Sequence, residues 1–241
     1  MRLSELKSII DNSSNIVFFG GAGVSTESNI PDFRSNKGLY NTESKFSYPP
    51  EVMLSHSFLK DHTEEFFKFY REKMIFKDAK PNDAHKALGI LEQRGKLKAV
   101  VTQNIDGLHQ EAGSKNVLEL HGSIHRNYCD SCGKSYDLKY VLSSKTIVPK
   151  CDTCGGVVRP DVVLYEESLD TEIIERTVEY VGNADVLIIG GTSLVVYPAA
   201  SLIGYFRGDK LVLINKSSTP YDESADLVIN DSIGKVLASI L

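Results

Sequence analysis

Short apolar runs alternate along the chain with stretches in which apolar residues recur every three or four positions. The runs predict strands at 16–19, 97–102, 117–120, 184–189, 210–214 and 227–229. The periodic stretches predict helices around residues 3–10 and at 61–76, 83–93, 199–206 and 233–241. Strands that are apolar throughout and alternate with helices indicate an α/β fold with a doubly wound, mostly parallel, Rossmann-like sheet.

Polar or glycine-rich segments follow several of these predicted strands directly. Three glycines, Gly20, Gly21 and Gly23, follow the first strand, and a turn without side chains can aim its N–H groups at a phosphate. Residues 103–106 follow the second strand, and Asn215 ends another. Open α/β sheets bind ligands at the carboxyl ends of their strands, so a ligand site is expected there. An ordinary tight strand exit, and a helix start at Asp106, are the alternatives.

The four cysteines form two Cys-x-x-Cys pairs, Cys129 with Cys132 and Cys151 with Cys154. This spacing fits a zinc ion held by four thiolates, and four thiolates leave no open position for water, so the metal would be structural. A nucleic-acid-binding zinc ribbon and a redox pair are the alternatives. The pairs interrupt the α/β pattern, which predicts that they belong to an insert.

Composition narrows the class of protein further. The chain has 241 residues, of which 41% are hydrophobic and 24% charged, so one packed domain, or a large lobe with a small insert, is expected. A net charge of −5 disfavours a nucleic-acid binder. No apolar run approaches a membrane span, and residues 1–7 lack the apolar core of a secretory signal. We therefore expect a cytoplasmic protein without membrane or nucleic-acid partners, and by default a monomer.

Several motifs resemble the signatures of the sirtuins, the NAD-dependent protein-lysine deacylases, in their short bacterial form. Residues 21–34 resemble the pattern Gly-Ala-Gly-x-Ser followed by Ile-Pro-Asp-Phe-Arg, and residues 102–109 match Thr-Gln-Asn-Ile-Asp-Gly-Leu-His throughout. His121 with Gly122 resembles the catalytic His-Gly, and residues 191–200 resemble the pattern Gly-Thr-Ser-Leu-x-Val-x-Pro-Ala-Ala. Two positions depart, because Gly20 stands where the family usually has Thr and Asn29 where it usually has Gly.

The resemblance implies roles for individual residues. His121 would be the catalytic base, and Asn104 would order a ribose and a water. The NAD-binding residues that it implies are Gly21, Ala22, Gly23, Ser25, Thr26, Ile30, Asp32, Phe33, Arg34, Gln103, Asn104, Ile105, Asp106, His121, Gly191, Thr192, Ser193, Asn215 and Ile233. Asp106 and the Ile105 backbone would hold the carboxamide of nicotinamide.

Residues 159–167 look like the segment with which sirtuins pair the substrate peptide as an added strand. Val162, Val163 and Tyr165 would bind the peptide. The family's Phe-Gly-Glu reads Tyr165, Glu166 and Glu167 here, which adds a side chain and a charge beside the peptide. An edge strand without a partner is the alternative.

The same resemblance limits which acyl groups are expected as substrates. Sirtuins that remove succinyl or malonyl groups carry a Tyr-x-x-Arg pair, whose positions correspond here to Phe67 and Tyr70, with Arg71 adjacent. The resemblance therefore implies a preference for neutral acyl groups. The aromatic residues around these positions could instead form a small core of their own.

Together these features predict an NAD-dependent protein-lysine deacetylase or deacylase that transfers the acyl group to ADP-ribose and releases nicotinamide. Residues 1–41, 82–124 and 157–241 would form the Rossmann-like lobe, and the helical insert 42–81 with the zinc module 125–156 the small lobe. The alternatives are an NAD-dependent oxidoreductase and a non-catalytic zinc-ribbon module. The first lacks a full G-x-G-x-x-G turn here, and the second leaves His121 without a role.

Overall fold

A six-stranded parallel sheet forms the centre of the molecule in the computed structural model, which describes residues 2–35, 38–40 and 46–241. The strand order is β3-β2-β1-β7-β8-β9. The strands are β1 (Ile16–Gly20), β2 (Leu97–Thr102), β3 (Val117–Glu119), β7 (Val186–Gly190), β8 (Lys210–Ile214) and β9 (Leu227–Ile229). The predicted strands are confirmed to within two residues at each end. The order is that of a Rossmann fold, and it reverses between β1 and β7, where such folds bind ligands.

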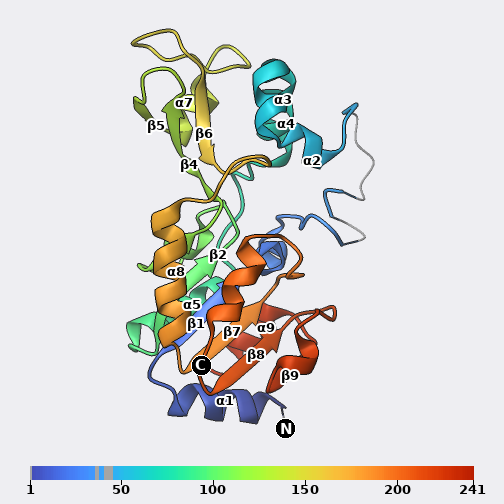
Figure 1. The fold of residues 1–241 in the computed structure, drawn as a ribbon, viewed down its shortest axis with the longest axis vertical. Coiled ribbons are helices and arrows are strands. Elements are labelled where there is room, and N and C mark those ends of the chain that lie inside the picture. Colours follow the sequence, from blue (N-terminus) through green and yellow to red (C-terminus); the bar gives the residue numbers. More distant parts are fainter. Residues whose placement is uncertain (1, 36–37, 41–45) are drawn as a thin grey trace.

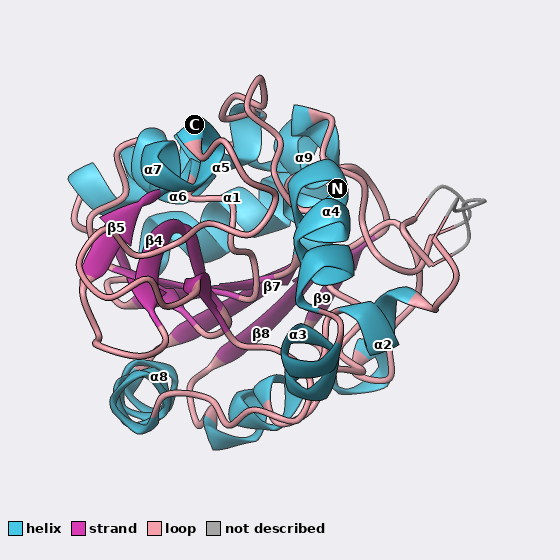
Figure 2. Cartoon of the chain, turned by 90° about the horizontal axis from the view of Figure 1, so that it is seen from above, coloured by secondary structure: helices cyan, strands magenta, loops and turns pink. Residues whose placement is uncertain are grey.

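Helices cover both faces of this sheet (Figures 1 and 2). On one face α1 (Arg2–Asn12), α5 (Asp83–Gln93) and α9 (Ile233–Ala238) pack against alternate strand residues such as Phe18. On the other face α8 (Thr171–Asn183) and the 3-10 helix η3 (Ala199–Tyr205) pack against the intervening residues. Burial of both faces explains why the strands read as continuous apolar runs rather than alternating ones.

A smaller lobe lies beyond one end of the large sheet (Figure 1). Its antiparallel sheet has the order β5-β4-β6, with β4 (Gly122–Cys129), β5 (Ser135–Asp137) and β6 (Val158–Val162), and α7 (Leu138–Ser143) packs beside it. Its helical part comprises α2 (Pro50–Met53), α3 (His56–Asp61) and α4 (Thr63–Lys73). The remaining elements are α6 (Leu108–Glu111) and the 3-10 helices η1 (Ala22–Val24), η2 (Thr26–Ser28) and η4 (Asp222–Ser224).

The small sheet corrects the predicted lobe boundaries. β4 and β6 pair with each other, so boundaries at 124/125 and 156/157 cut through this sheet rather than around it. Residues 159–167 are expected to be extended, but the pairing of β6 with β4 was not predicted, because Pro160 and Asp161 are residues that strands disfavour. The predicted boundary at 41/42 lies outside the described residues.

Three helix predictions also differ from the structure. The helix expected at 61–76 is α4 alone, separated from α3 by His62, whose ψ of 45° breaks the helical geometry. The helix expected at 199–206 is the 3-10 helix η3, and α9 ends at Ala238 rather than Leu241. The helix α8 was not predicted, although its apolar residues recur at helical spacing.

Candidate active site

A cavity of about 1600 Å³ opens between the two lobes at the carboxyl ends of the large sheet's central strands. Every residue to which the family resemblance assigns an NAD contact lines it, from Gly21 at the first turn to Ile233 at the start of α9. Single small-molecule sites usually occupy about 300–1,000 Å³, so the cavity has room for a dinucleotide and an acylated side chain together.

The glycine-rich turn packs directly on the turn after β7. The Gly23 N–H donates to the Gly191 carbonyl at 2.8 Å. A Cβ on Gly23 would lie 2.7 Å from that carbonyl oxygen, and a Cβ on Gly21 would lie 2.9 Å from the Thr192 Cβ. Glycine is therefore required at both positions for the two turns to meet at the switch in strand order.

The two departures from the family's first signature are accommodated by local geometry. Asn29 has a φ of 63°, the left-handed conformation that asparagine tolerates better than most residues. Gly20 ends β1 beneath the Phe18 ring, and a Cβ there would approach that ring to 2.5 Å. The threonine usual in the family would therefore require the ring of Phe18 to move.

Residues of the two signatures join in one hydrogen-bonded network on the cavity wall. The Ser25 hydroxyl donates to Asp106 Oδ2 at 2.6 Å and accepts from the Asn104 amide at 3.0 Å. Asp106 Oδ1 also accepts the Leu108 N–H at 3.0 Å, so Asp106 does help to start α6, the alternative that its sequence position left open. Burial raises the pKa of Asp106 against the opposing effect of these two hydrogen bonds.

His121 lies between β3 and β4 and also lines the cavity. Its Nδ1 is 3.0 Å from the Gln103 carbonyl oxygen, which can only accept, so the proton is on Nδ1. The Nε2 lone pair is then available as a base. Burial lowers the pKa of His121, partly offset by the bond to Gln103, so the imidazole stays neutral at pH 7.

The expected peptide-binding residues fall into two groups. Val162, Val163 and Tyr165 line the cavity, and the Tyr165 hydroxyl is 2.8 Å from that of Tyr40, which follows the Asp32–Arg34 motif. Phe67 and Tyr70 do not line it. Both lie on α4 at 0% and 1% exposure, within a buried aromatic cluster of the helical insert. The structure therefore supports the alternative of a separate small core for these two rings and not a contact with an acyl group.

Tyr70 carries a buried hydroxyl without a hydrogen-bond partner in the described part of the chain. On folding, that hydroxyl loses its hydrogen bonds to water and gains none in the protein. Tyr70→Phe should therefore stabilise the fold by about 1 kcal/mol and raise Tm by about 2–4 °C. Tyr140→Phe is the matched control, since the Tyr140 hydroxyl donates to the Lys150 carbonyl at 2.7 Å and its removal should lower Tm. An altered acyl preference in Tyr70→Phe would instead place this ring at the substrate.

The four cysteines meet at the tip of the small sheet, with all sulfur atoms within 4.8 Å of one another. The Sγ atoms of Cys129 and Cys154 are 3.4 Å apart, and those of Cys132 and Cys151 are 3.7 Å apart. A tetrahedral zinc site with bonds of 2.3 Å has sulfur atoms about 3.8 Å apart. The cluster therefore fits one zinc ion with four thiolate ligands.

Part of the cavity wall was not foreseen from the sequence. Met74 and Ile75, which follow α4, line it, and so do Leu138 and Leu142 of α7. These segments are far from the signatures in the chain, and only the folding of the insert against the small sheet brings them together. An amphipathic pattern in 138–143 was the one available signal.

Strand order, the glycine turn and the polar strand ends together define a Rossmann-like nucleotide-binding protein that carries a four-cysteine metal module. Comparison with family models identifies the family within this class: the Sir2 family model matches residues 21–198. The chain belongs to the Sir2 family.

Individual relatives agree with this assignment over the full length. A protein named NAD-dependent protein deacetylase from Clostridium acetobutylicum is 71% identical over 240 residues, covering 100% of this chain and 98% of its own. One of the same name from Clostridium tetani is 70% identical, covering 98% of this chain and 96% of its own. A solved structure described as Sir2-p53 peptide-NAD+ has 39% identity and a TM-score of 0.87, covering 100% of this chain and 97% of its own.

No helix in the described ranges has both the length and the apolar character needed to cross a membrane.

Proposed function

We propose that this protein is an NAD-dependent protein-lysine deacetylase that consumes NAD as a co-substrate. One observation carries the proposal: a single cavity is lined by all the expected NAD-binding residues, by His121 and by the peptide segment at Val162, Val163 and Tyr165. Relatives up to 71% identical bear this name, and similar solved structures contain NAD or acetylated peptide.

Bound NAD would supply the electrophilic sugar carbon to which the acyl oxygen is transferred as nicotinamide leaves. The glycine turn, which lacks bulky side chains, would let the pyrophosphate approach the backbone closely, and Asp106, held by Ser25, would bind the nicotinamide carboxamide. His121 Nε2 would take the proton from a ribose hydroxyl. Asp32, Phe33 and Arg34 would shield the reaction from water, and Asn215 with Ile233 would hold the adenosine half.

The test is release of nicotinamide from NAD in the presence of an acetyl-lysine peptide. We expect release that depends on the acetyl group, with an unmodified lysine peptide as the control, and no appearance of reduced nicotinamide absorbance. Hydride transfer to the cofactor would instead favour an oxidoreductase, the alternative that the Rossmann-like sheet alone leaves open.

Neutral acyl groups are the proposed substrates. Arg71, which follows Tyr70 in the sequence and is next to the position that would bind a succinyl carboxylate, does not line the cavity. Its Nη2 instead donates to the Val141 and Thr146 carbonyls at 2.8 and 3.3 Å, which fixes it against α7. Arg71 therefore has a structural role in place of a substrate contact.

We expect a matched succinyl-lysine peptide to react at least about 100-fold more slowly than the acetyl peptide, because neither Phe67, Tyr70 nor Arg71 offers its carboxylate a cation in the cavity. Initial rates at low peptide concentration measure this ratio. Comparable rates for the two peptides would contradict it. A propionyl peptide, which is larger but uncharged, separates the effect of charge from that of size.

We expect the protein to work in the cytoplasm as a monomer, with acyl-lysine proteins as its partners. The four cysteines support a reducing compartment, since their arrangement suits a metal rather than disulfides.

A further inference from the structure

The segment that follows β6, residues 163–167, is bonded through its backbone to the start of α3 and the residues just before it. The Tyr165 N–H donates to the Leu54 carbonyl at 2.9 Å, and the His56 N–H donates to the Tyr165 carbonyl at 3.0 Å. On the opposite side the Val163 N–H donates to the His121 carbonyl at 3.0 Å. The segment therefore bridges the helical insert and the catalytic histidine.

Glu166 has an unusual backbone conformation within this segment. Its φ is 76°, the left-handed region that disfavours side chains, and the family resemblance places glycine at this position. A glutamate here costs conformational energy that a glycine would not, so the conformation persists only if the surroundings hold it.

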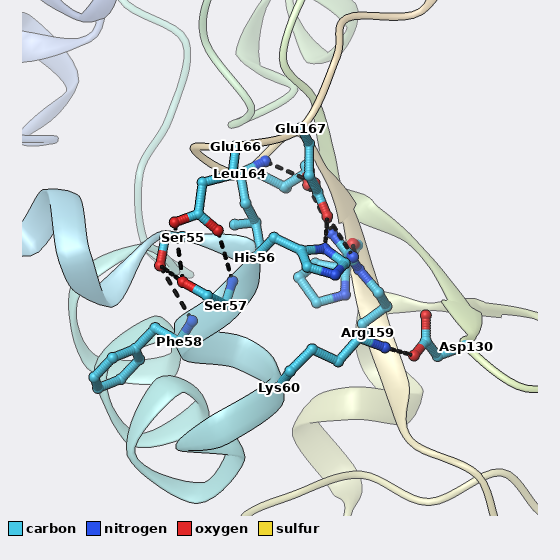
Figure 3. Close-up of polar contacts among 12 residues, drawn as sticks. Ser55, His56, Ser57, Phe58, Lys60, Asp130, Arg159, Leu164, Glu166 and Glu167 are labelled. Atoms are coloured by element: carbon cyan, nitrogen blue, oxygen red, sulfur yellow. Dashed lines mark hydrogen bonds and ion pairs between the residues drawn. The ribbon is translucent and has the colours of Figure 1, made fainter.

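The side chain of Glu166 supplies that support. Its Oε2 accepts the Ser57 N–H at 2.9 Å, and its Oε1 accepts the Ser57 hydroxyl at 2.9 Å (Figure 3). The next N–H of α3, from Phe58, is capped by the Ser55 hydroxyl at 3.1 Å. With the Tyr165 carbonyl on His56, the first three N–H groups of α3 are all satisfied, two of them by residues of the peptide segment.

A second anchor holds the base of the segment independently of Glu166. The buried Arg159 donates to both carboxylate oxygens of Glu167 at 2.7 and 3.0 Å, and the Leu164 N–H and His56 Nδ1 also donate to Glu167. Burial alone would raise the pKa of Glu167, but these bonds lower it to about 2. Loss of Glu166 should therefore loosen the outer part of the segment without unfolding it.

The outer part of the segment also carries free hydrogen-bonding groups. Among the described residues, neither the Val163 carbonyl nor the Glu166 N–H has a partner. Groups of this kind on an exposed edge can pair with an added strand. The backbone conformation at Glu166 sets the direction of its own N–H. The side-chain bonds to Ser57 therefore also orient an N–H that could pair with the substrate peptide.

We propose that Glu166 is a positioning residue for the acylated substrate, which clamps the peptide-binding segment onto the first turn of α3 through Ser57. The identity of that substrate rests on the proposed function; the clamp itself does not. The bonded glutamate fixes a backbone conformation that a glycine would leave flexible. A segment that is already ordered binds a peptide more tightly, because less conformational entropy is lost on binding.

The test compares Glu166→Gly with the native protein in steady-state deacetylation of an acetyl-lysine peptide. We expect KM for the peptide to rise about threefold to tenfold, a modest effect because the bonds lost are exposed to solvent. KM for NAD and kcat should stay within about twofold, because the second anchor keeps the segment in place. Glu166→Gln keeps an accepting oxygen, and Ser57→Ala keeps the N–H contact. The peptide KM of each variant should therefore lie between that of the native protein and that of Glu166→Gly.

Glu175→Gly is the matched control, because it removes an exposed glutamate from α8 on the large lobe. It should lower stability without raising the peptide KM. An unchanged peptide KM in Glu166→Gly, or an equal rise in Glu175→Gly, would overturn the proposal.

Hydrogen exchange separates failure of the clamp from failure of the proposed function. In Glu166→Gly the amides of Ser57 and Tyr165 should exchange faster, while those of β1 and β7 should not. If the native protein deacetylates no peptide, the proposed function fails, and this exchange pattern still tests the clamp. Unchanged exchange at Ser57 would overturn it, whatever the activity.

Discussion

Replacement of His121 by alanine should lower deacetylation about 100-fold to 10,000-fold, the usual contribution of a general base. The proton on Nδ1 is held by the Gln103 carbonyl, which leaves Nε2 as the accepting atom at the cavity wall. His125 is also held by the turn after β2, but there it is Nε2 that lies 3.0 Å from a carbonyl oxygen, that of Asp106. The loss should appear in kcat, while peptide binding should be preserved.

His62→Ala is the matched control, because His62 is an exposed histidine at the junction of α3 and α4. Rates for both variants can be followed by nicotinamide release at saturating NAD. Native-like kcat in His121→Ala would contradict the assignment of the base.

The fall of kcat at acidic pH should also reflect His121 acting as the base. A base works in its neutral form, and burial lowers the pKa of His121 from 6.5. The neutral form therefore persists below pH 6.5, and kcat should begin to fall only as the pH drops through a lower value. An acid limb centred above pH 6.5 would contradict this account.

Removal of zinc should destabilise the small sheet and abolish deacetylation. Among the described residues, the apolar core around the cysteines contains Val141 and Val158, with Tyr136 and Tyr140 packed beside it. A core of this size stabilises the cysteine end of the sheet only weakly, and structural zinc sites contribute about 10–16 kcal/mol of binding free energy in isolated peptides. Because β6 leads directly into the peptide segment, its loss should also remove substrate binding.

Cys151→Ser is the matching substitution, since it deletes one ligand with little change in size. We expect a metal content well below one zinc per chain, a Tm lower by more than about 10 °C and no measurable activity. Ser131→Ala, between the first two ligands, is the control and should keep both zinc and activity. Native Tm and activity in a protein shown by metal analysis to lack zinc would refute the structural role.

The large lobe could be predicted because its signals are local. β1, β2 and β7 are buried on both faces, so an apolar run marks each of them directly. The ligand-binding residues stand at the ends of these strands, and a parallel sheet necessarily gathers them at one edge. The sequence therefore predicts which residues gather at this edge, and those expected to bind NAD all line the cavity.

The small lobe could not be predicted in the same way, because its structure depends on distant contacts. β6 contains a proline and is a strand only because β4 pairs with it. Phe67 and Tyr70 match positions that contact acyl groups in relatives, yet packing of α4 turns both rings into the insert's own core. Glu166 could be identified as a departure from the family, but not its partner Ser57, which lies on a different element.

The central claim is that one cavity brings NAD and an acetylated lysine together for deacetylation. Mass spectrometry of the products from NAD and an acetyl-lysine peptide tests it most directly. The account predicts deacetylated peptide, nicotinamide and O-acetyl-ADP-ribose in equal amounts, with deacetylated peptide and O-acetyl-ADP-ribose reduced at least about 100-fold in His121→Ala. Release of free acetate while NAD stays intact, or intact peptide and intact NAD with a fully zinc-loaded protein, would contradict it.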